Sequence, residues 1–523
     1  MDVRLKDLVG KIPAAAVVYD ALRPRRPRTR YSLERLAVRL PRAVAEARPY
    51  AERGTTGSKL VLFATLHYWI EQAAIIGLVL RGMGHDVTIA YLPYSSWDKR
   101  INTFDLQRQD LYTRRILAPL AGLVNVISLR DFHAGESMPA GLTEAVETAA
   151  KFDVMYSLQV EEVNADSALY KLRMERNRLA CKAALAYLRR QQPDAALIPN
   201  GLVTEMGVFY QAARFLGTTA VTYEFNDQRE QIWIACNDVV MHQNTDALWQ
   251  ARGSAALTEA QRGKIRAFEE ARQGARTFGK GTRLWQESPS EGSEKLRRAL
   301  GLDGRPVVLL ATNVLGDSLT LGRNIFASSM AEWIEKSVKY FVGRPDIQLV
   351  IRIHPGERLI KGPSMMRVIE RAAPDKPEHI HVISPTERIN TYDVMGLASL
   401  GLAYTTTVGM EMAMRGVPVI AAGRTHYRDR GFAMAPRSWD EYFGMLEDVL
   451  RDPAAHRLST GQVEAAWNYA YRFFFEFPFD FPWRLMHFWK DIEEWPVGRV
   501  LSEEGRATFG KAFDHLAGAR ITW

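Results

Sequence analysis

The stretches LVIRIH (349–354), LGLAYT (400–405) and VPVIAAG (417–423) decide the fold that this sequence predicts. Their apolar residues do not alternate with polar ones, and such runs are typical of strands buried on both faces of a parallel sheet. Between the second and third runs, TTTVGMEMAMRG (405–416) predicts a turn of small residues, a short helix from near Val408 or Gly409, and a stop at Gly416. This crossover places the helix N-terminus at the carboxyl edge of the sheet, where its N–H groups and dipole face a bound anion.

Polar and cationic side chains are expected at the same edge, because they follow the predicted strands in the sequence. RPVVLLATNV (305–314) predicts one more strand of this sheet, with Asn313 in the turn after it. We therefore predict that the edge binds the phosphates and ribose of a nucleotide, through Asn313, Arg352, His354, Thr405, Thr406, Thr407, Gly409 and Arg424. Structural roles stay open for two of them: a salt bridge between Arg352 and Glu357, and a satisfied histidine at a strand end for His354.

Length and composition narrow the class of protein. A chain of 523 residues predicts two or three domains, and 47 % apolar with 24 % charged residues is ordinary for a soluble globular protein. Two cysteines, Cys181 and Cys236, form neither a disulfide framework nor a metal site, so a reducing cytoplasm is the default expectation. The sequence has no apolar run long enough to span a membrane and no apolar signal core, so we expect no membrane span and no secretion.

Positive charge is concentrated at the N-terminus. Residues 1–50 contain 12 Lys and Arg against 5 Asp and Glu, whereas the whole chain carries a net charge of +8. The remainder is close to neutral, and this argues against a nucleic-acid-binding surface. Within this basic arm, residues 31–48 have helical spacing interrupted at Pro41, and two interpretations of 23–48 stay open: contact with anionic lipid at a membrane surface, or packing on the protein's own surface.

An N-terminal Rossmann-like domain is predicted from Lys59 onward. KLVLFAT (59–65), a helix and DVTIAYL (86–92) form a first β-α-β unit without G-x-G-x-x-G, which disfavours a dinucleotide. DAALIP (194–199), a helix from Thr204 and TAVTYEF (219–225) form a second unit. The candidate catalytic residues at this carboxyl edge are His67, Glu205 and Glu224; a helix-capping role for His67 and a buried ion pair of Glu224 with Arg229 stay open. The helix predicted at 168–191 is amphipathic, and we expect its basic face to be solvated.

The predicted organisation has five parts, and we expect an α/β protein with two Rossmann-like domains that face each other across a cleft. They are a basic arm (1–50), an N-terminal acceptor domain (51–285), a linker (286–304), a C-terminal donor domain (305–465), and a helical tail (466–523) that packs across the domains. The aromatic run FFFEFPFDFPW (473–483) in the tail is expected to pack at a domain interface, with membrane docking as the alternative.

Two Rossmann-like halves with the nucleotide site in the second half resemble the GT-B glycosyltransferase architecture. RIHPGE (352–357), YTTTVGMEMAMRGVPVIAAG (404–423) and, more weakly, PNGL with GTTAVTYEF (within 199–225) are similar to the bacterial capsule polysaccharide biosynthesis proteins, whose best-known members are Kdo transferases. Related patterns occur in UDP-GlcNAc 2-epimerases. The resemblance implies that His354 binds the nucleotide phosphate, that Thr406 and Thr407 contact phosphate or sugar, and that Glu411 contacts the ribose or base.

We therefore expect a glycosyltransferase that moves a sugar from a CMP- or UDP-linked donor to a glycan or lipid-linked acceptor in surface polysaccharide synthesis. No D-x-D pair follows a predicted strand, so we expect a metal-independent enzyme without a cofactor, in which N–H groups and cationic side chains stabilise the leaving phosphate. Two alternatives stay open, a nucleotide-sugar epimerase on the same fold and an inactive scaffold that binds glycan or protein. We expect the protein in the cytoplasm or at the inner face of the cell membrane.

Overall fold

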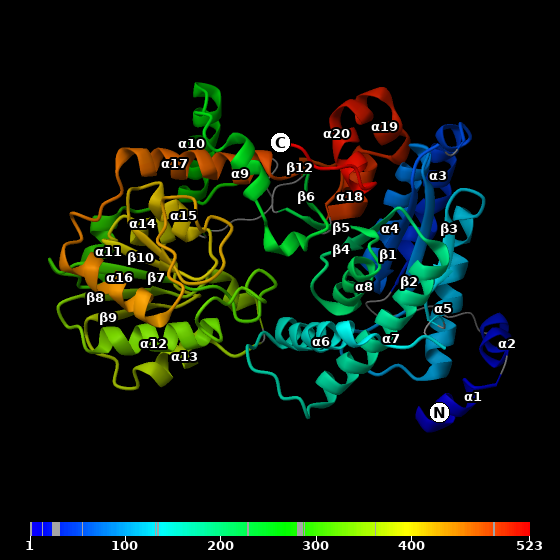
Figure 1. Ribbon diagram of the computed structural model, residues 1–523, viewed down its shortest axis with the longest axis horizontal. Helices are drawn as coiled ribbons and strands as arrows, with labels where there is room; N and C mark the ends of the chain where they lie inside the picture. The colour runs from blue at the N-terminus through cyan, green and yellow to red at the C-terminus, as the bar shows by residue number, and fades with distance from the viewer. Residues whose placement is uncertain are drawn as a thin grey trace. The chain divides into compact units, whose positions relative to one another are not determined.

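A computed structural model describes residues 3–12, 14–22, 32–54, 56–130, 132, 135–226, 230–279, 286, 288–360, 362–484 and 487–523 (Figure 1). The chain forms two compact units. Unit 1 comprises 1–153, 164–241 and 478–521, and unit 2 comprises 154–163, 242–477 and 522–523. Each unit contains one β-sheet with helices on its faces, which confirms the predicted α/β class with two Rossmann-like parts.

Unit 1 has a sheet with the strand order β12-β6-β5-β4-β1-β2-β3 in the described part of the chain. The strands are β1 (Lys59–Thr65), β2 (Asp86–Leu92), β3 (Asn125–Ser128), β4 (Ala195–Pro199), β5 (Thr219–Phe225), β6 (Gln231–Cys236) and β12 (Phe479–Asp480). β1 to β5 are parallel, whereas β6 and β12 add antiparallel strands that the sequence analysis did not predict. Because the chain winds outward in both directions from β1 and β4, the switch point of this sheet lies between these two strands.

The helices of unit 1 surround this sheet. They are α1 (Val3–Val9), α2 (Ala15–Leu22), α3 (Glu34–Ala51), α4 (Leu66–Gly82), α5 (Thr103–Leu117), the start of α6 (Thr143–Leu158), α7 (Ala168–Gln191), α8 (Thr204–Phe215), α18 (Phe488–Glu494), α19 (Val497–Leu501) and α20 (Glu503–Leu516). The predicted interruption at Pro41 is wrong, since α3 continues through both Pro41 and Pro49. Tertiary packing outweighs the lost hydrogen bonds, because Leu36, Leu40 and Val44 on the inner face are buried.

The prediction that the basic face of the helix at 168–191 is solvated is also wrong in part. Arg173 and Arg176 of α7 are buried, and their guanidinium groups donate hydrogen bonds to backbone carbonyls of the loop that follows β2. Arg176 also stacks on the ring of Tyr94 in this loop, at 4.5 Å from the ring centroid. The two arginines therefore fix the β2–α5 loop instead of facing solvent.

Unit 2 contains a five-stranded parallel sheet with the order β11-β10-β7-β8-β9 in its described residues. The strands are β7 (Val307–Ala311), β8 (Gln348–Arg352), β9 (Ile380–Ile383), β10 (Leu400–Ala403) and β11 (Val419–Ala421). Its helices are α9 (Asp246–Arg252), α10 (Glu259–Gln273), α11 (Ser293–Ala299), α12 (Met330–Val342), α13 (Met365–Ala372), α14 (Thr391–Met395), α15 (Val408–Ala413), α16 (Trp439–Arg451) and α17 (Thr460–Tyr471). The switch point lies between β7 and β10.

Successive residues of β7 belong to two separate hydrophobic cores of unit 2. Val308 and Leu310 belong to the core that also contains Trp333 of α12, whereas Val307 and Leu309 belong to the core that contains Met412 of α15. All four strand residues are buried. This arrangement confirms the prediction, made from apolar runs without alternation, of strands covered on both faces.

The division into units differs from the predicted domain bounds. Residues 242–279, which the sequence analysis placed in the N-terminal domain, belong to unit 2. Ion pairs join α10 of this segment to α15 and to the residues just after it. Arg272 lies 3.0 Å from Glu411, and Glu269 pairs with Arg415. The aromatic run 473–483 is divided: its residues to Phe477 belong to unit 2 and those from Pro478 onward to unit 1. Both Phe473 and Trp483 are buried, and such burial does not favour membrane docking of the run.

Candidate functional site

The carboxyl edge of the unit 2 sheet brings together ends of three strands. The backbone N–H of Thr405, just after β10, donates to the side-chain oxygen of Asn313, just after β7, at 3.2 Å. The backbone N–H of His354, just after β8, donates to the Thr312 hydroxyl at 3.0 Å. The three predicted nucleotide-binding residues Asn313, His354 and Thr405 are half-buried at this edge. Asn313 and Thr405 therefore flank the switch point, where open α/β sheets bind ligands, and His354 lies at the end of the next strand, β8.

His354 has one ring nitrogen fixed by its own turn. Its Nδ1 accepts a hydrogen bond of 3.0 Å from the backbone N–H of Gly356, so the side chain caps the 3₁₀ helix Pro355–Leu359. An Nδ1 that accepts a hydrogen bond leaves the ring proton on Nε2 in the neutral form. His354 thus has the structural role that the sequence analysis left open. Its Nε2–H is a hydrogen-bond donor, and an anion requires a donor.

Polar groups that lack partners follow both β10 and β11 in unit 2. Thr405 Oγ1, Thr425 Oγ1 and His426 Nε2 are buried and have no hydrogen-bond partner among the described residues. Buried hydroxyl groups without a partner are uncommon in native proteins and call for an explanation. Between these residues in the sequence, Arg424 has an exposed side chain, and its backbone N–H is held at 2.8 Å by the carbonyl of Arg323. Two hydroxyl donors without a partner and an exposed arginine thus follow β10 and β11 at this edge, and hydroxyl and guanidinium groups are donors that bind anions.

The Arg352 side chain is bound to the loop after β9, and not to the residues around Thr405 and Thr425. It is buried, and its guanidinium donates to the carbonyls of Ser384 at 2.8 Å and Ile389 at 3.2 Å, in the loop after β9. Burial lowers the pKa of Arg352 to about 10. Glu357, the alternative partner, accepts hydrogen bonds from Ser364 and Met365 instead. Arg352 thus holds a loop, and its nucleotide contact stays a prediction.

Glu411 and Gly409 of α15 are directed into the interior of unit 2. Glu411 is buried, where it pairs with Arg272 and accepts a 3.1 Å hydrogen bond from the Thr407 hydroxyl. Gly409 is buried beside the Tyr427 hydroxyl, and a Cβ at this position would collide with that oxygen. Glu411 and Gly409 therefore have a structural role in unit 2, and Thr407 shares it through its hydrogen bond to Glu411. The sequence analysis had predicted only nucleotide contacts for these residues.

Thr406 also contributes mainly to packing. Its hydroxyl accepts a 3.3 Å hydrogen bond from the N–H of Val408, and its carbonyl accepts one of 2.8 Å from the Tyr427 hydroxyl. The helix α15 begins at Val408 as predicted, and Gly416 has a positive φ of 73° beyond its end, which is the conformation expected of the predicted stop.

The switch point of the unit 1 sheet is marked by strained backbone. Leu66 after β1, Asn200 after β4 and Thr204 at the start of α8 have φ values of 61°, 57° and 56°. A left-handed conformation is uncommon for leucine and rarer for the β-branched threonine. Such strain persists where the surrounding fold imposes it, and it gathers at functional sites. The three residues therefore mark this edge as a candidate acceptor site.

Glu224 lies at the same edge, at the end of β5. Its Oε2 accepts a 3.0 Å hydrogen bond from the side-chain amide of Asn200, and its Oε1 accepts one of 3.0 Å from the N–H of Phe225. Asn200, after β4, and Glu224, at the end of β5, are thus brought together at this edge. Burial raises the pKa of Glu224, and the two hydrogen bonds oppose the rise. Arg229, the alternative partner, lies outside the described residues.

Glu205 is part of a buried ionic network rather than of the open edge. Its Oε1 lies 2.9 Å from Arg173, which also contacts Asp153 at 2.8 Å. Asp153 further accepts hydrogen bonds from the Asn177 side chain at 2.7 Å and from the backbone N–H of Thr204. All of these side chains are buried. A carboxylate paired in this way is poorly placed to accept a proton from a substrate, so the geometry favours Glu224 over Glu205.

His67 follows β1 and is half-buried, with its ring 5.1 Å from that of Tyr68. Burial lowers the pKa of His67, so the ring is neutral near pH 7. A neutral imidazole can accept a proton. His67 therefore remains a second candidate for the catalytic base.

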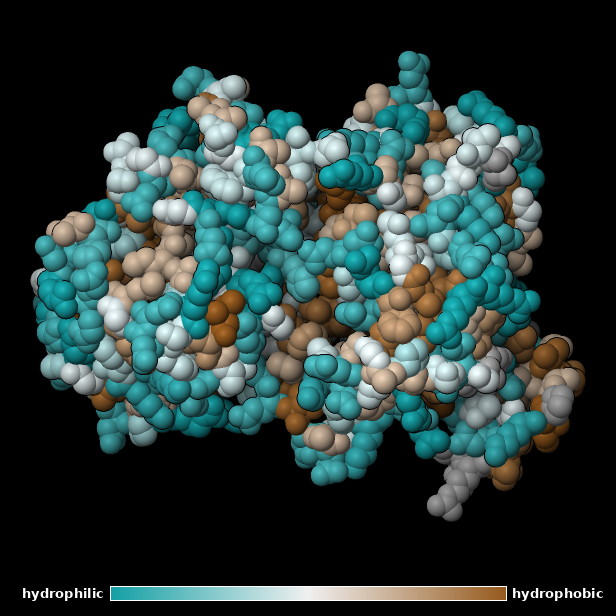
Figure 2. All heavy atoms as spheres, in the orientation of Figure 1, coloured by the Kyte–Doolittle hydropathy of each residue, from teal (hydrophilic) through white to brown (hydrophobic). Residues whose placement is uncertain are grey.

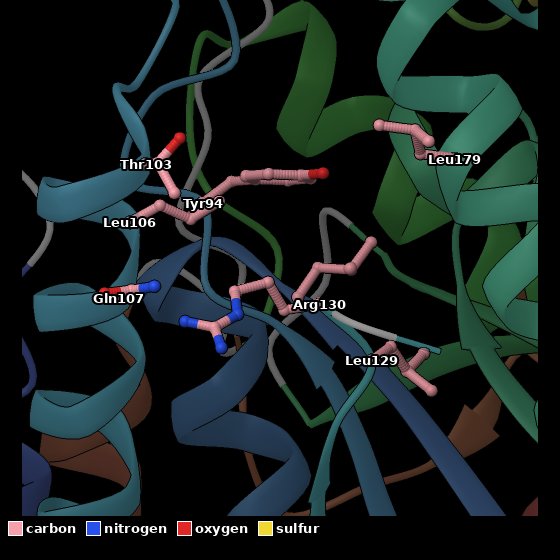
Figure 3. A pocket seen from close by; sticks show the side chains of 8 residues that line it. Tyr94, Thr103, Leu106, Gln107, Leu129, Arg130 and Leu179 are labelled. Atoms are coloured by element: carbon pink, nitrogen blue, oxygen red, sulfur yellow. The ribbon is translucent and has the colours of Figure 1, made fainter. Parts of the chain in front are cut away.

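A cavity of about 310 Å³ opens in unit 1 at the carboxyl ends of β2 and β3 (Figure 3). The side chains that line it are Leu92, Tyr94, Thr103, Leu106, Gln107, Leu129, Arg130 and Leu179. In Figure 3 the Tyr94 ring lies above the Arg130 side chain, and the Arg130 guanidinium points toward Gln107 of α5. The lining does not include His67, Glu205 or Glu224, so this cavity was not predicted from the sequence.

Several functional groups escaped sequence analysis. Thr312, Arg323 and Arg272 follow no motif, and their roles depend on hydrogen bonds to distant segments: Arg323, for example, donates to the carbonyl of His242. The loop 425–431 looked polar in the sequence, yet Thr425, His426 and Tyr427 are buried. Among the described residues, no three His, Cys, Asp or Glu side chains are grouped as metal ligands, and no helix is long and apolar enough to cross a bilayer.

Comparisons with known proteins give weak similarities only. No protein-family model matches the chain, and a search of curated proteins found no match. A solved structure similar to it is the KpsC β-Kdo 2,4-transferase of Thermosulfurimonas dismutans, with 14 % identity over 53 % of this chain and 79 % of that one, and a TM-score of 0.34. Another is the UDP-GlcNAc 2-epimerase of Neisseria meningitidis bound to UDP-GlcNAc, with 11 % identity over 80 % and 98 % and a TM-score of 0.27. At these scores neither similarity carries an argument about function.

Proposed function

We propose that the chain is a metal-independent glycosyltransferase that moves a sugar from a CMP- or UDP-linked donor to a glycan or lipid-linked acceptor in surface polysaccharide synthesis. Unit 2 binds the donor nucleotide, and unit 1 binds the acceptor. The observation that carries the proposal is that Asn313 and Thr405 are joined across the switch point of the unit 2 sheet, with His354 bound to Thr312 at the end of the neighbouring strand β8. Switch points are the usual ligand sites of open α/β sheets.

The donor edge supplies the chemistry that a leaving phosphate needs. When the bond between the sugar carbon and the phosphate oxygen breaks, negative charge develops on that oxygen, and preorganised hydrogen-bond donors stabilise it. The Thr405 and Thr425 hydroxyls follow β10 and β11, are buried and lack partners in the described structure, so they can donate to this oxygen once the loops that cover them open. The exposed Arg424 adds a positive charge at the same edge.

Glu224 is the proposed base of the transfer. It accepts the proton of the acceptor hydroxyl while the acceptor oxygen forms a bond to the sugar carbon and the nucleotide leaves. A base acts best when its pKa is near the working pH, and burial moves the pKa of Glu224 in that direction. The Asn200 amide fixes the carboxylate, so its orientation is set before the acceptor binds.

The cavity beside β2 and β3 suits an apolar part of the acceptor. Its walls include four leucines and the Tyr94 ring, and its volume of about 310 Å³ falls at the lower end of the range for ligand pockets. A lipid-linked acceptor supplies such an apolar part.

The test is a calorimetric titration with CMP, CDP, UDP and GDP, repeated with Arg424→Ala and Glu224→Gln variants. The matched control is Arg367→Ala, which removes an exposed arginine of α13 from the same unit. We expect one nucleotide to bind, the Arg424→Ala variant to lose about tenfold or more in affinity, and the control and Glu224→Gln variants to retain it. Absence of binding to all four nucleotides would reject the donor site, and epimerised sugar without any acceptor would replace transfer by epimerisation.

A further inference from the structure

Exposed apolar side chains gather on the first two helices of unit 1. Of the thirteen large apolar side chains that are exposed in the described part of the chain, seven lie between residues 5 and 22: Leu5, Leu8, Ile12, Val17, Val18, Tyr19 and Leu22. Leu8 is 60 % exposed and Leu22 78 %. Figure 2 shows the corresponding brown and tan atoms over α1 and α2, at the lower right of the view. Apolar patches of this kind mark contact surfaces.

These two helices are attached firmly to α5, so their exposed face is a defined surface. Gly10 lies against the backbone of Phe104, where a Cβ would be 2.5 Å from the amide nitrogen. The carboxylate of Asp7 accepts a 2.7 Å hydrogen bond from the N–H of Thr103 at the start of α5. Lys6 forms an ion pair of 2.8 Å with Asp105 on the first turn of the same helix.

The charges of this segment are arranged asymmetrically. Asp20 is buried and pairs with Arg115 at 2.8 Å, and Asp7 is bound to Thr103, so both carboxylates among the described residues of α1 and α2 face α5. The exposed side keeps Lys11. Arg114 and Arg115, on the last turn of the neighbouring α5, are about half exposed, and each pairs with a buried carboxylate, Arg114 with Asp110 at 3.0 Å and Arg115 with Asp20. The surface is therefore apolar, and the charged groups that reach solvent at its margin are cationic while their carboxylate partners are buried.

We propose that this α1–α2 surface docks on a lipid bilayer that carries anionic headgroups. Helices in the membrane interface bury their apolar face at the boundary between headgroups and acyl chains, while basic side chains at their margin attract anionic lipid. An anionic bilayer requires only apolar area beside cationic side chains, and this surface has both. A protein partner would in addition need an acidic surface of matching shape. The docking is a property of unit 1 and goes beyond the nucleotide site.

This surface differs from the membrane contact that the sequence predicted at 23–48. In the described part of that range, α3 buries Leu36, Leu40 and Val44 against unit 1, so its apolar side is occupied. Residues 23–31 lie outside the described part of the chain. The group of seven exposed apolar side chains precedes that range, at 5–22, whereas Val38 is the one exposed large apolar side chain in the described part of 23–48.

The test is co-sedimentation of the full chain with vesicles of phosphatidylcholine mixed with phosphatidylglycerol, and with vesicles of phosphatidylcholine alone. We expect the protein to bind the anionic vesicles, and the triple variant Leu8→Asp/Val17→Asp/Leu22→Asp to lose about tenfold or more in partition coefficient. The control variant Phe215→Asp/Leu359→Asp changes exposed apolar residues elsewhere and keeps the wild-type partition. Thermal unfolding of each variant checks that the fold is intact.

Three results would overturn the proposal: a wild-type protein that stays in the supernatant with anionic vesicles, a folded triple variant that binds as the wild type does, or equal binding to both vesicle types. Light scattering without vesicles tests whether a second copy of the chain binds to this surface instead. A wild-type dimer that becomes a monomer in the triple variant, with no vesicle binding, would assign the surface to a second copy of the chain. Nucleotide titration of the triple variant remains independent, so failure of docking and failure of the donor site are distinguishable.

Discussion

The side-chain oxygen of Asn313 accepts a 3.2 Å hydrogen bond from the backbone N–H of Thr405, and this bond joins the chain just after β7 to the chain just after β10. These two strands are neighbours at the switch point of the unit 2 sheet. The bond holds the backbone turn that leads into α15 at a fixed distance from the end of β7. It thereby positions the Thr405 hydroxyl, which has no other partner in the described structure.

Replacing Asn313 separates this structural role from nucleotide binding. Asn313→Asp keeps an oxygen that accepts from Thr405 but adds a negative charge, so we expect near-wild-type stability with at least a tenfold loss of nucleotide affinity. Asn313→Ala removes the hydrogen bond and should destabilise unit 2 by about 1 kcal/mol. Calorimetric titration and denaturant unfolding measure the two effects. An Asp variant that binds nucleotide as tightly as the wild type would exclude a phosphate near Asn313.

The second prediction concerns the pH dependence of transfer. The Asn200 amide stabilises the ionised form of Glu224, so its removal should raise the pKa of this carboxyl further. Because the base must be ionised, the acidic limb of the kcat/KM profile should move to higher pH in Asn200→Gly. Glycine tolerates the φ of 57° at this position, but the N–H groups of Leu202 and Val203 also lose the Asn200 oxygen, so thermal unfolding of the variant checks that the fold is intact.

The same assay includes Glu224→Gln. We expect a loss of about 10²- to 10⁴-fold in kcat with unchanged nucleotide affinity, as for other catalytic bases. If the acidic limb does not move in Asn200→Gly, or if Glu224→Gln turns over normally, His67 becomes the leading candidate, and His67→Gln would then be measured in the same way.

The third prediction is that Arg173 acts on stability. Arg173→Met would leave Asp153 and Glu205 buried without their cation, and this should reduce the free energy of unfolding by about 3–5 kcal/mol. Arg178→Met on the same helix is the control, since Arg178 is exposed and its loss should change stability little. Denaturant unfolding of both variants decides the matter. Equal stabilities would show that the buried network is not needed for the fold.

The fourth prediction concerns Glu71 of α4, which is buried and accepts a 3.3 Å hydrogen bond from Trp489. Burial raises the pKa of Glu71 from 4.5 to about 7. The folded state thus binds a proton more tightly than the unfolded chain, so the stability from this proton is fully present below about pH 4.5 and is lost as the pH rises through about 7.

Glu71→Gln removes this dependence, because glutamine stays neutral. Relative to the wild type, the variant should gain about 1–3 kcal/mol in the free energy of unfolding between about pH 5 and pH 8. Thermal or denaturant unfolding across this range measures the difference. The control is Glu175→Gln, an exposed position whose effect should not vary with pH. A constant difference between Glu71→Gln and the wild type would contradict the raised pKa.

Strands could be predicted more reliably than the surroundings of charged residues. The runs at 59–65, 86–92 and 219–225 are strands with the predicted bounds, because continuous apolar segments bounded by turn residues have few other stable arrangements. The sequence around Arg173 contains no comparable pattern that predicts its burial. Its burial depends on Asp153 and Glu205, which approach it only after α7 and α8 pack together.

The candidate site shows the same limit. The sequence placed Asn313, His354 and Thr405 at one edge, since parallel strands end together, and the structure confirms this placement. Sequence alone could not show that the side chains of Arg352 and Glu411 are held by other segments of unit 2. Their directions are set by loop carbonyls after β9 and by Arg272 of α10, which are distant along the chain.

The sequence by itself therefore determined the α/β class, the parallel strands of both sheets and the strand ends that carry polar residues, because periodicity and turn chemistry act locally along the chain. The tertiary structure decided which helices join which unit, which charges are buried in pairs, and which apolar side chains of α1 and α2 remain exposed. The physical reason is that burial and ion pairing depend on contacts between segments far apart in sequence, and the free energy of a charged or apolar side chain depends on those neighbours more than on its own residue type.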